Sequence, residues 1–131
     1  MATLFTRIIN GEIPCYKVAE DEHHFAFLDI GPMAKGHTLV VPKHEDDYIF
    51  NLDAHTYTDL WLFAKRVAAA VEKAVPCKRV GVAVMGLEVP HVHIHLVPLN
   101  AESDLSVTKA KLQVPPEEMQ AIADKIAANF K

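Results

Sequence analysis

The chain has 131 residues, of which 50% are apolar and 23% are charged. This length and composition predict one globular domain with a hydrophobic core of its own. The formal charge of −4 argues against a long nucleic-acid backbone as partner, and no apolar stretch approaches the roughly 20 residues that span a bilayer.

The two cysteines indicate a reducing compartment. Cys15 and Cys77 are far apart in the sequence, form no Cys-x-x-Cys motif and follow no stretch with the character of a signal peptide. We therefore expect reduced thiols and a cytoplasmic protein.

The first part of the chain predicts three strands. Residues 13–20 and 24–30 are mainly apolar and flank the polar turn at Asp21 and Glu22. Residues 31–36 contain two glycines and a proline and predict a loop, which leads into a strand over residues 37–41 that Pro42 closes.

The second part of the chain predicts two helices and two more strands. Asp53 is the expected N-cap of a helix that runs to about residue 75, and Pro115 and Pro116 open a last helix. Apolar residues recur at helical spacing in both: Tyr57, Leu60, Trp61, Ala64, Val67, Ala68 and Val71 in the first, and Met119, Ile122, Ile126 and Phe130 in the second. With strands over residues 79–85 and 91–97, the sequence predicts an α+β fold. Its sheet has about five mostly antiparallel strands, beside one long central helix and a C-terminal helix.

Three histidines alternate with apolar residues in the last predicted strand. His91, His93 and His95 are separated by Val92 and Ile94. A strand sends successive side chains to opposite faces, so all three rings should lie on one face, about 6.6 Å apart along the strand. With an ordinary pKa of about 6.5, imidazole can act as a base, an acid or a nucleophile near neutral pH.

Three interpretations of this row remain open. A metal site would suit imidazole, but three rings in a line about 13 Å long cannot all reach one ion without a sharp bend and further ligands from elsewhere. Nucleophilic catalysis at phosphorus would use one ring to form a covalent phosphohistidine and its neighbours to donate to the phosphoryl oxygens. The third interpretation is a surface strand that happens to carry histidines.

The sequence of these residues resembles the histidine triad (HIT) family. Residues 91–97, His-Val-His-Ile-His-Leu-Val, match its pattern of three histidines alternating with apolar residues. Residues 5–20 resemble the opening hairpin of the family, and residues 25–30 and 36–43 resemble its nucleotide-side strands. The likeness covers residues 4–98, and the tail over 99–131 is less specific. It implies the HIT-like fold and one HIT domain over residues 1–131.

The resemblance assigns roles to four histidines. It implies that His93 is the nucleophile that takes up the nucleotidyl group and that His95 contacts the phosphate or the leaving group. His91, with His37 behind it, would orient and polarise the nucleophile. The transferase branch of the family typically carries glutamine in place of the third histidine, so His95 indicates the Hint-like hydrolase branch. A buried, satisfied core imidazole is the alternative interpretation of His37.

The resemblance also implies a nucleotide site. Asp29 occupies the position that binds the ribose hydroxyls, and one carboxylate can accept from both of them. A carboxylate at the end of an apolar strand is costly to bury without a partner, which favours a functional role. The implied base pocket consists of Leu4, Phe5, Ile8, Phe27, Leu28 and Ile30. For Ile8 and Leu28, ordinary core packing is nearly as good an interpretation.

Two features depart from the family pattern. The segment over residues 85–90 is short and lacks the usual asparagine, and Glu88 stands near a place usually held by a neutral polar residue. A carboxylate there would repel phosphate unless it points away or is protonated, although main-chain N–H groups from Gly86 to Val89 could still bind phosphate. Some bacterial relatives carry a Cys-x-x-Cys zinc motif where Thr3 and Thr6 stand here.

We therefore expect no structural metal and no cofactor. His44 follows the Pro-Lys pair, where relatives often have a histidine. Without two cysteine thiolates it lacks partners for a zinc site. Four further histidines are expected on the surface: His23, His24, His44 and His55.

These observations predict a hydrolase that cleaves a substituent from the α-phosphate of a purine nucleoside monophosphate through a nucleotidyl-His93 intermediate. Nucleoside phosphoramidates or adenylated small molecules would be substrates, AMP would bind, and no divalent metal would be required. Resemblance also implies a homodimer. The alternative is a nucleotide-binding or scaffolding module with little catalytic activity, which the short loop with Glu88 favours.

Overall fold

The computed structural model describes residues 2–131 as an α+β domain, as the sequence predicts. Its strands are β1 (Lys17–Glu20), β2 (His24–Leu28), β3 (Thr38–Pro42), β4 (Arg79–Ala83) and β5 (Ile94–Leu99). Its helices are α1 (Leu4–Ile9), α2 (Ala54–Ala74) and α3 (Pro116–Asn129), together with the short 3-10 helices η1 (Ile49–Asn51) and η2 (Glu102–Asp104). Within the described residues no helix has both the length and the apolar character needed to cross a membrane.

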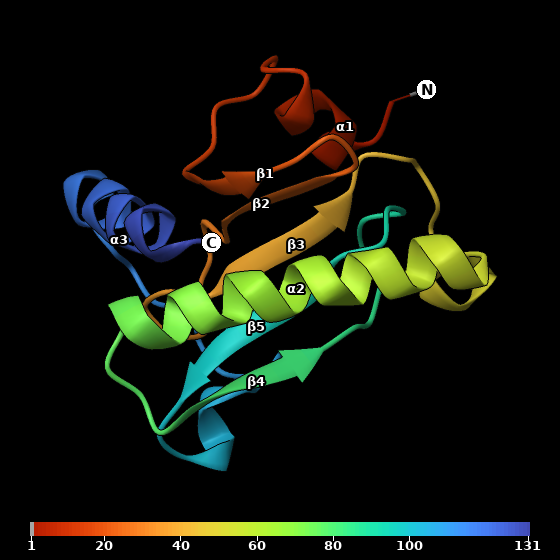
Figure 1. Cartoon of the computed structure of the whole chain (residues 1–131). Coiled ribbons are helices and arrows are strands. Elements are labelled where there is room, and N and C mark those ends of the chain that lie inside the picture. Colours follow the sequence, from red (N-terminus) through yellow and green to blue (C-terminus); the bar gives the residue numbers. More distant parts are fainter. Residues whose placement is uncertain (1) are drawn as a thin grey trace.

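The five strands form one sheet in the order β1-β2-β3-β5-β4, and every neighbouring pair is antiparallel. Helix α2 crosses one face of this sheet, with α3 beside it, while α1 lies at the β1–β2 end (Figure 1). Every residue of β2 and β3 is buried, because both faces of these central strands are covered.

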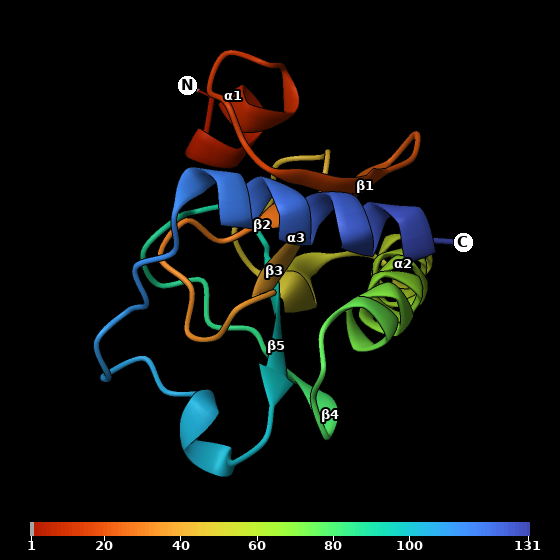
Figure 2. The ribbon, with the colours of Figure 1, turned by 90° about the vertical axis from the view of Figure 1, so that its left-hand side faces the viewer.

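The alternation of side chains along β2 divides the interior into two clusters. Ala26 and Leu28 pack with α2 and α3 in the larger cluster. Phe25 and Phe27 face the opposite way and pack with Phe5 of α1. The second cluster forms the floor beneath α1 and lies on the side of the sheet away from α2 (Figure 2).

The ends of α2 follow from its sequence. The Asp53 side chain accepts a hydrogen bond from the Thr56 amide at 2.8 Å, so the predicted N-cap is confirmed. The helix ends at Ala74, two residues before Pro76, which has no N–H to continue the helical hydrogen bonds. Its buried stripe is centred on Leu60, Phe63 and Val67.

The predicted N-terminal segment is partly wrong. Residues 4–9 form a helix, N-capped by the Thr3 hydroxyl, where the resemblance implied a hairpin over residues 5–20. The strand expected over 13–20 begins only at Lys17, since Pro14 lacks the N–H needed for a strand pairing. The second strand ends at Leu28, two residues earlier than predicted.

The strand predicted over residues 91–97 begins only at Ile94, and the strand over 79–85 ends at Ala83. Main-chain groups ahead of β5 bind to loops instead of a neighbouring strand. The His91 N–H donates to the Val89 carbonyl at 2.8 Å, and the Val92 N–H donates to the Asp46 carbonyl at 2.7 Å. Two of the three alternating histidines therefore lie in an irregular approach to the strand.

Replacement of a buried residue of α2 should destabilise the fold far more than replacement of an exposed one. Leu60 is 0% exposed, so Leu60→Ala leaves a cavity and should cost about 2–5 kcal/mol. Leu62, on the same helix, is 55% exposed, and Leu62→Ala should change stability by less than about 1 kcal/mol. Urea unfolding followed by circular dichroism measures both; equal losses would contradict the two-layer arrangement.

Candidate active site

A cavity of about 460 Å³ lies on the α1 side of the sheet, above the smaller apolar cluster. Its wall comes from α1, the ends of β2 and β5, the segment over residues 85–89 and the segment over residues 106–111. It brings together almost all the predicted site residues: Leu4, Phe5, Ile8, Phe27, Leu28, Asp29, Ile30, His37, Gly86, Val89, His93 and His95. Among the predicted residues, His91 alone is absent from the lining.

His93 is held with one ring nitrogen available in the cavity. Its Nδ1 lies 2.7 Å from the main-chain oxygen of His91, and since a carbonyl only accepts, Nδ1 carries the proton and donates. In the neutral ring Nε2 therefore has the lone pair. The Phe5 ring meets the His93 ring edge to face, with centroids 4.9 Å apart, which fixes its tilt. Only 8% of His93 is exposed.

His37 and His95 form a hydrogen-bonded pair whose tautomers are set by the main chain. The Met33 N–H donates to His37 Nδ1 at 3.0 Å, so the proton of neutral His37 is on Nε2. That Nε2 lies 3.0 Å from His95 Nδ1, to which it donates. His95 consequently carries its proton on Nε2. The neighbouring rings of His93 and His95 have centroids 4.9 Å apart.

This contact corrects the predicted position of His37. The resemblance placed it behind His91, but the structure places it against His95. Strand pairing accounts for the difference: Leu39 of β3 lies opposite His95 of β5, which brings the residue just before β3 to the His95 ring.

Burial keeps this pair neutral. Desolvation lowers the pKa of His37 to about 4; the Asp29 carboxylate opposes this change, while Lys111 and His93 add to it. The pKa of His95 also falls to about 4, chiefly by desolvation and by the proximity of His37 and His93. At neutral pH both rings therefore act as uncharged hydrogen-bond donors and acceptors.

The His91 ring is a structural element beside the cavity. It is completely buried, its Nε2 donates to the Pro42 carbonyl at 2.8 Å, and the Thr3 hydroxyl donates to its Nδ1 at 2.6 Å. Burial lowers the pKa of His91. The three rings lie on one side of the chain, as predicted: Phe5 contacts both His91 and His93, His95 adjoins His93, and Val92 and Ile94 pack into the larger cluster. Because the protein engages both ring nitrogens of His91, its contribution to the site is its main-chain carbonyl.

Two threonines and a glutamate complete this anchor. The Glu45 carboxylate accepts from the Thr3 amide at 2.8 Å and from the Thr6 hydroxyl. The hydrogen bond from the Thr3 amide, followed by that from Thr6, lowers the pKa of Glu45. Thr3 and Thr6, at the positions of the zinc-binding cysteines of some relatives, thus join α1 to His91 by hydrogen bonds.

Asp29 borders the cavity at the end of β2. One carboxylate oxygen accepts from the Gly31 amide at 2.8 Å, and the other lies 3.7 Å from His37 Nε2. The side chain is 19% exposed, so its remaining lone pairs can accept hydroxyl groups from a ligand.

The donor atoms of Asp29, His37 and His95 lie within 4.8 Å of one another, which raises the question of a metal site. The hydrogen bonds answer it. A metal bound to His37 Nε2 would leave the proton of the neutral ring on Nδ1, pointing at the Met33 N–H, where two donors would then face each other. The residues fit a hydrogen-bonded relay better than a metal centre.

The apolar part of the cavity differs in detail from the prediction. Phe5, Ile8, Phe27 and Leu39 form its floor. Ile30 lies at the rim and is 81% exposed. Leu28 borders the cavity, but its side chain packs with α2 in the larger cluster, because it alternates with Phe27 along β2; this agrees with the core-packing interpretation of Leu28.

The comparisons with known proteins agree with this geometry. The HIT domain profile matches residues 10–102. The chain belongs to the HIT family. The adenosine 5'-monophosphoramidase hnt1 of Schizosaccharomyces pombe is 34% identical, with 100% of both chains covered. The adenosine 5'-monophosphoramidase HNT1 of Saccharomyces cerevisiae is 36% identical over 77% of this chain and 65% of its own length.

Solved structures show the same fold. A Hit-like protein from Bartonella henselae superposes with a TM-score of 0.83 at 30% identity, over 98% of this chain and 96% of that chain.

In this HIT protein the short segment before β5 contains Gly86 and Glu88, the residues expected near the phosphate. Gly86 has φ +71°, a backbone conformation that favours glycine. Glu88 borders the cavity and is exposed, so its charge remains hydrated.

Sequence reasoning missed several lining residues, and five of them bear on the polar part of the site. Met33 fixes a tautomer through its N–H, a role that no side-chain pattern reveals. The other four lie in the C-terminal tail. There the one sequence feature that could have indicated a site was the pair of lysines at alternate positions, Lys109 and Lys111. The residues concerned are Met33, Ser106, Val107, Lys109 and Lys111.

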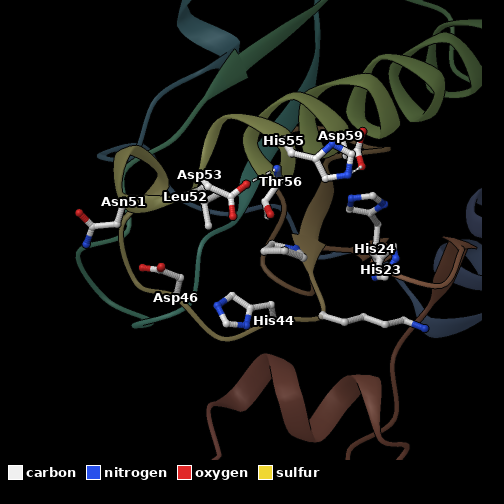
Figure 3. A pocket seen from close by; sticks show the side chains of 12 residues that line it. His23, His24, His44, Asp46, Asn51, Leu52, Asp53, His55, Thr56 and Asp59 are labelled. Atoms are coloured by element: carbon white, nitrogen blue, oxygen red, sulfur yellow. Dashed lines mark hydrogen bonds and ion pairs between the residues drawn. The ribbon is translucent and has the colours of Figure 1, made fainter.

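A second cavity, of about 330 Å³, gathers the four histidines expected on the surface (Figure 3). His23, His44 and His55 are exposed, as predicted. The prediction for His24 is wrong: it is buried, its ring stacks on Phe63 with centroids 4.9 Å apart, and its Nδ1 lies 2.9 Å from Asp21.

The groups of this second cavity are largely engaged with one another. His55 lies 3.2 Å from Asp59, and Asp53 caps α2 (Figure 3). Among residues 2–131, only the Asp29, His37 and His95 group brings three metal-ligating atoms within 4.8 Å.

The buried histidines should make the fold sensitive to mild acid. The folded-state pKa values of His37 and His95, about 4, lie below the ordinary 6.5, so the unfolded chain binds protons that the folded chain does not. Their contribution is complete above pH 6.5 and is lost as the pH falls toward 4. We expect a loss of about 1–3 kcal/mol between pH 6.5 and 5, measured by urea unfolding.

The control is His23→Asn, at an exposed position, which should keep the same pH dependence as the wild type. His37→Asn combined with His95→Asn should flatten it. Equal wild-type stability at pH 6.5 and pH 5 would contradict the neutral state of the buried pair.

Proposed function

We propose that this HIT protein is a nucleotide hydrolase of the Hint-like branch. It cleaves a substituent from the α-phosphate of a purine nucleoside monophosphate through a covalent nucleotidyl-His93 intermediate. The observation that carries the proposal is the tautomer of His93: its Nδ1–H is held by the His91 carbonyl, so the neutral ring has its lone pair on Nε2, and the His95 ring lies next to it with centroids 4.9 Å apart.

A nucleotide fits the cavity in one direction. The base packs against Phe5 and Ile8 of α1 and Phe27 of β2, apolar side chains that grip a purine without reading its edges. The ribose hydroxyls donate to Asp29. The α-phosphate then lies at His93 and His95, with the main-chain N–H groups of residues 86–89 nearby. The volume of about 460 Å³ is in the range of small-molecule sites.

The reaction proceeds by two displacements at phosphorus. In the first, His93 Nε2 forms a bond to the α-phosphorus as the bond to the leaving group breaks, and the His91 carbonyl stabilises the resulting imidazolium through Nδ1–H. The Nε2–H of His95 donates to a phosphoryl oxygen or to the departing atom. In the second, water attacks phosphorus, AMP is released and neutral His93 is restored.

The names of two relatives support the substrate class. The proteins of S. pombe and S. cerevisiae are named as adenosine 5'-monophosphoramidases. We infer that nucleoside phosphoramidates and adenylated small molecules are the substrates of this chain too. Because histidines and main-chain donors surround the phosphate, we expect activity without a divalent metal and without a cofactor.

The covalent step can be detected directly. Wild-type protein mixed briefly with an adenosine phosphoramidate in mild acid should gain the mass of one adenylyl group, measured by intact-protein mass spectrometry. His93→Ala should show no adduct and a loss of turnover of at least about 10³-fold, because the nucleophile is gone. His55→Ala, at an exposed position on α2, is the matched control and should behave as wild type.

A second candidate is a nucleotide-binding or scaffolding module with little catalytic activity. The exposed Glu88 carboxylate at the cavity favours it, since a negative charge near the phosphate would oppose binding of the transition state. Tight AMP binding with negligible turnover of phosphoramidates, dinucleoside polyphosphates and adenylated amino acids would establish this alternative. Wild-type turnover by His93→Ala would exclude the proposed nucleophile.

We also propose a homodimer in the cytoplasm. Strand β4 lies at one edge of the sheet, and apolar side chains are exposed there and on α2, among them Val82 and Leu62. Cys15 and Cys77 are free thiols, as in a reducing compartment. Sedimentation velocity should give twice the chain mass, and Val82→Lys should shift the protein toward the monomer. A wild-type monomer at micromolar concentration would contradict the dimer.

A further inference from the structure

The chain between β5 and α3 closes one side of the active-site cavity. It passes through η2 and then runs beside the loop that follows β2 (Figure 2). A main-chain hydrogen bond of 2.9 Å from Leu112 to Pro32 fixes this approach. Ser106, Val107, Lys109 and Lys111 consequently line the cavity, although they are far from the triad in sequence.

The two lysines bring positive charge that the protein does not neutralise by direct pairing. Within residues 2–131, no carboxylate forms an ion pair of 4.0 Å or less with Lys109 or Lys111. The Lys111 side chain lies against Gly31: a Cβ built there would be 2.8 Å from Lys111 Cδ and 3.5 Å from Nζ. The absence of a side chain at Gly31 lets Lys111 reach across the loop toward the cavity.

Lys111 lies against Gly31 in the loop after β2 and faces the cavity that also contains His95. Its charge contributes to the lowered pKa of both His37 and His95. With the base against Phe5 and the ribose at Asp29, a group on the far side of the α-phosphate extends past His95. Lys109 and Lys111 line the same cavity as His93 and His95, so an anionic group on the leaving side of the phosphate can reach their segment.

The other groups of the cavity do not supply positive charge. His37 and His95 are uncharged at neutral pH, and Asp29 and Glu88 are carboxylates. Among the described lining residues, Lys109 and Lys111 are the only cationic side chains apart from the histidines. A negative charge on a leaving group would have no other fixed counter-charge.

We propose that Lys109 and Lys111 make this enzyme selective for substrates whose leaving group carries an anionic group of its own. Such a leaving group is an amine that bears a carboxylate, as in a nucleoside phosphoramidate of an amino acid. The P–N bond breaks as the His93–phosphorus bond forms, and the amine takes the proton that His95 Nε2 donates. His95 recovers a proton from the water that attacks phosphorus in the second step, and the carboxylate stays unchanged on the lysines. This inference rests on the proposed function and specifies its substrate class.

A matched pair of substrates isolates the carboxylate. We would compare kcat/KM for the adenosine phosphoramidates of β-alanine and β-alaninamide, which share the same P–N bond. The wild type should prefer the carboxylate substrate by about tenfold, as expected for a charge-assisted contact in a partly exposed site, and the preference should weaken with added salt. Lys109→Gln combined with Lys111→Gln should bring the ratio close to that set by the amines alone.

Two controls separate charge from shape and from general effects. Lys109→Arg with Lys111→Arg should retain most of the preference, since the positive charge is kept. Lys125→Gln removes an exposed lysine on α3 and should leave the ratio unchanged. An unchanged ratio in the double glutamine variant would overturn the proposal, as would an equal loss with both substrates, which would mean that the lysines only balance the charge of Asp29.

A binding measurement tests the role of the two lysines separately from the chemical step. In the His93→Ala background, calorimetry with AMP and ADP compares a ligand that ends at the α-phosphate with one that extends into the leaving-group region. ADP should bind more tightly, and the double glutamine variant should lose this advantage. If the wild type hydrolysed neither phosphoramidate, the proposed function would fail, and the ratio of ADP to AMP affinity would still confirm or overturn the role of the lysines.

Discussion

The hydrogen bond from His93 Nδ1–H to the main-chain oxygen of His91 is the contact on which the rest of the site depends. It requires a carbonyl that is not already used in a strand pairing, and β5 supplies one by starting only at Ile94. The His91 ring then has to be immobile, which the Pro42 carbonyl and the Thr3 hydroxyl achieve. The order of α1, β3 and β5 around this residue therefore serves to hold one carbonyl in place.

The same principle governs the other rings of the site. The Met33 N–H fixes the tautomer of His37, and His37 in turn fixes the tautomer of His95. Main-chain groups are rigid and uncharged, so they fix tautomers without introducing the charge that a carboxylate partner would bring. Burial then favours the neutral rings, and their pKa values fall. The hydrogen bonds thus direct the Nε2 lone pair of the neutral His93 ring and the Nε2–H of His95 away from the main chain.

Local patterns predicted those features that depend on local rules. The Asp53 cap and the end of α2 near residue 75 follow from short-range sequence. The division of β2 between two clusters was not predicted, since Phe27 and Leu28 were expected in the same pocket. The start of β5 was not predicted either, because it depends on loops that take up the N–H groups of His91 and Val92. The burial of His24 depends on Phe63, a residue distant in sequence. The ring contact of His37 likewise arises from strand register rather than from its own neighbours.

The charges around the cavity show why position matters more than net charge here. Two carboxylates, Asp29 and Glu88, and two ammonium groups, Lys109 and Lys111, border the same space, so their formal charges balance. A site of this kind gains little from overall attraction of anions, and neutral histidines add only dipoles. Binding must therefore depend on how each ligand group is aligned with each charge. In the proposed binding mode the hydroxyls lie at Asp29 and an anionic substituent lies at the lysines, and the orientation that separates them also brings the α-phosphorus to His93.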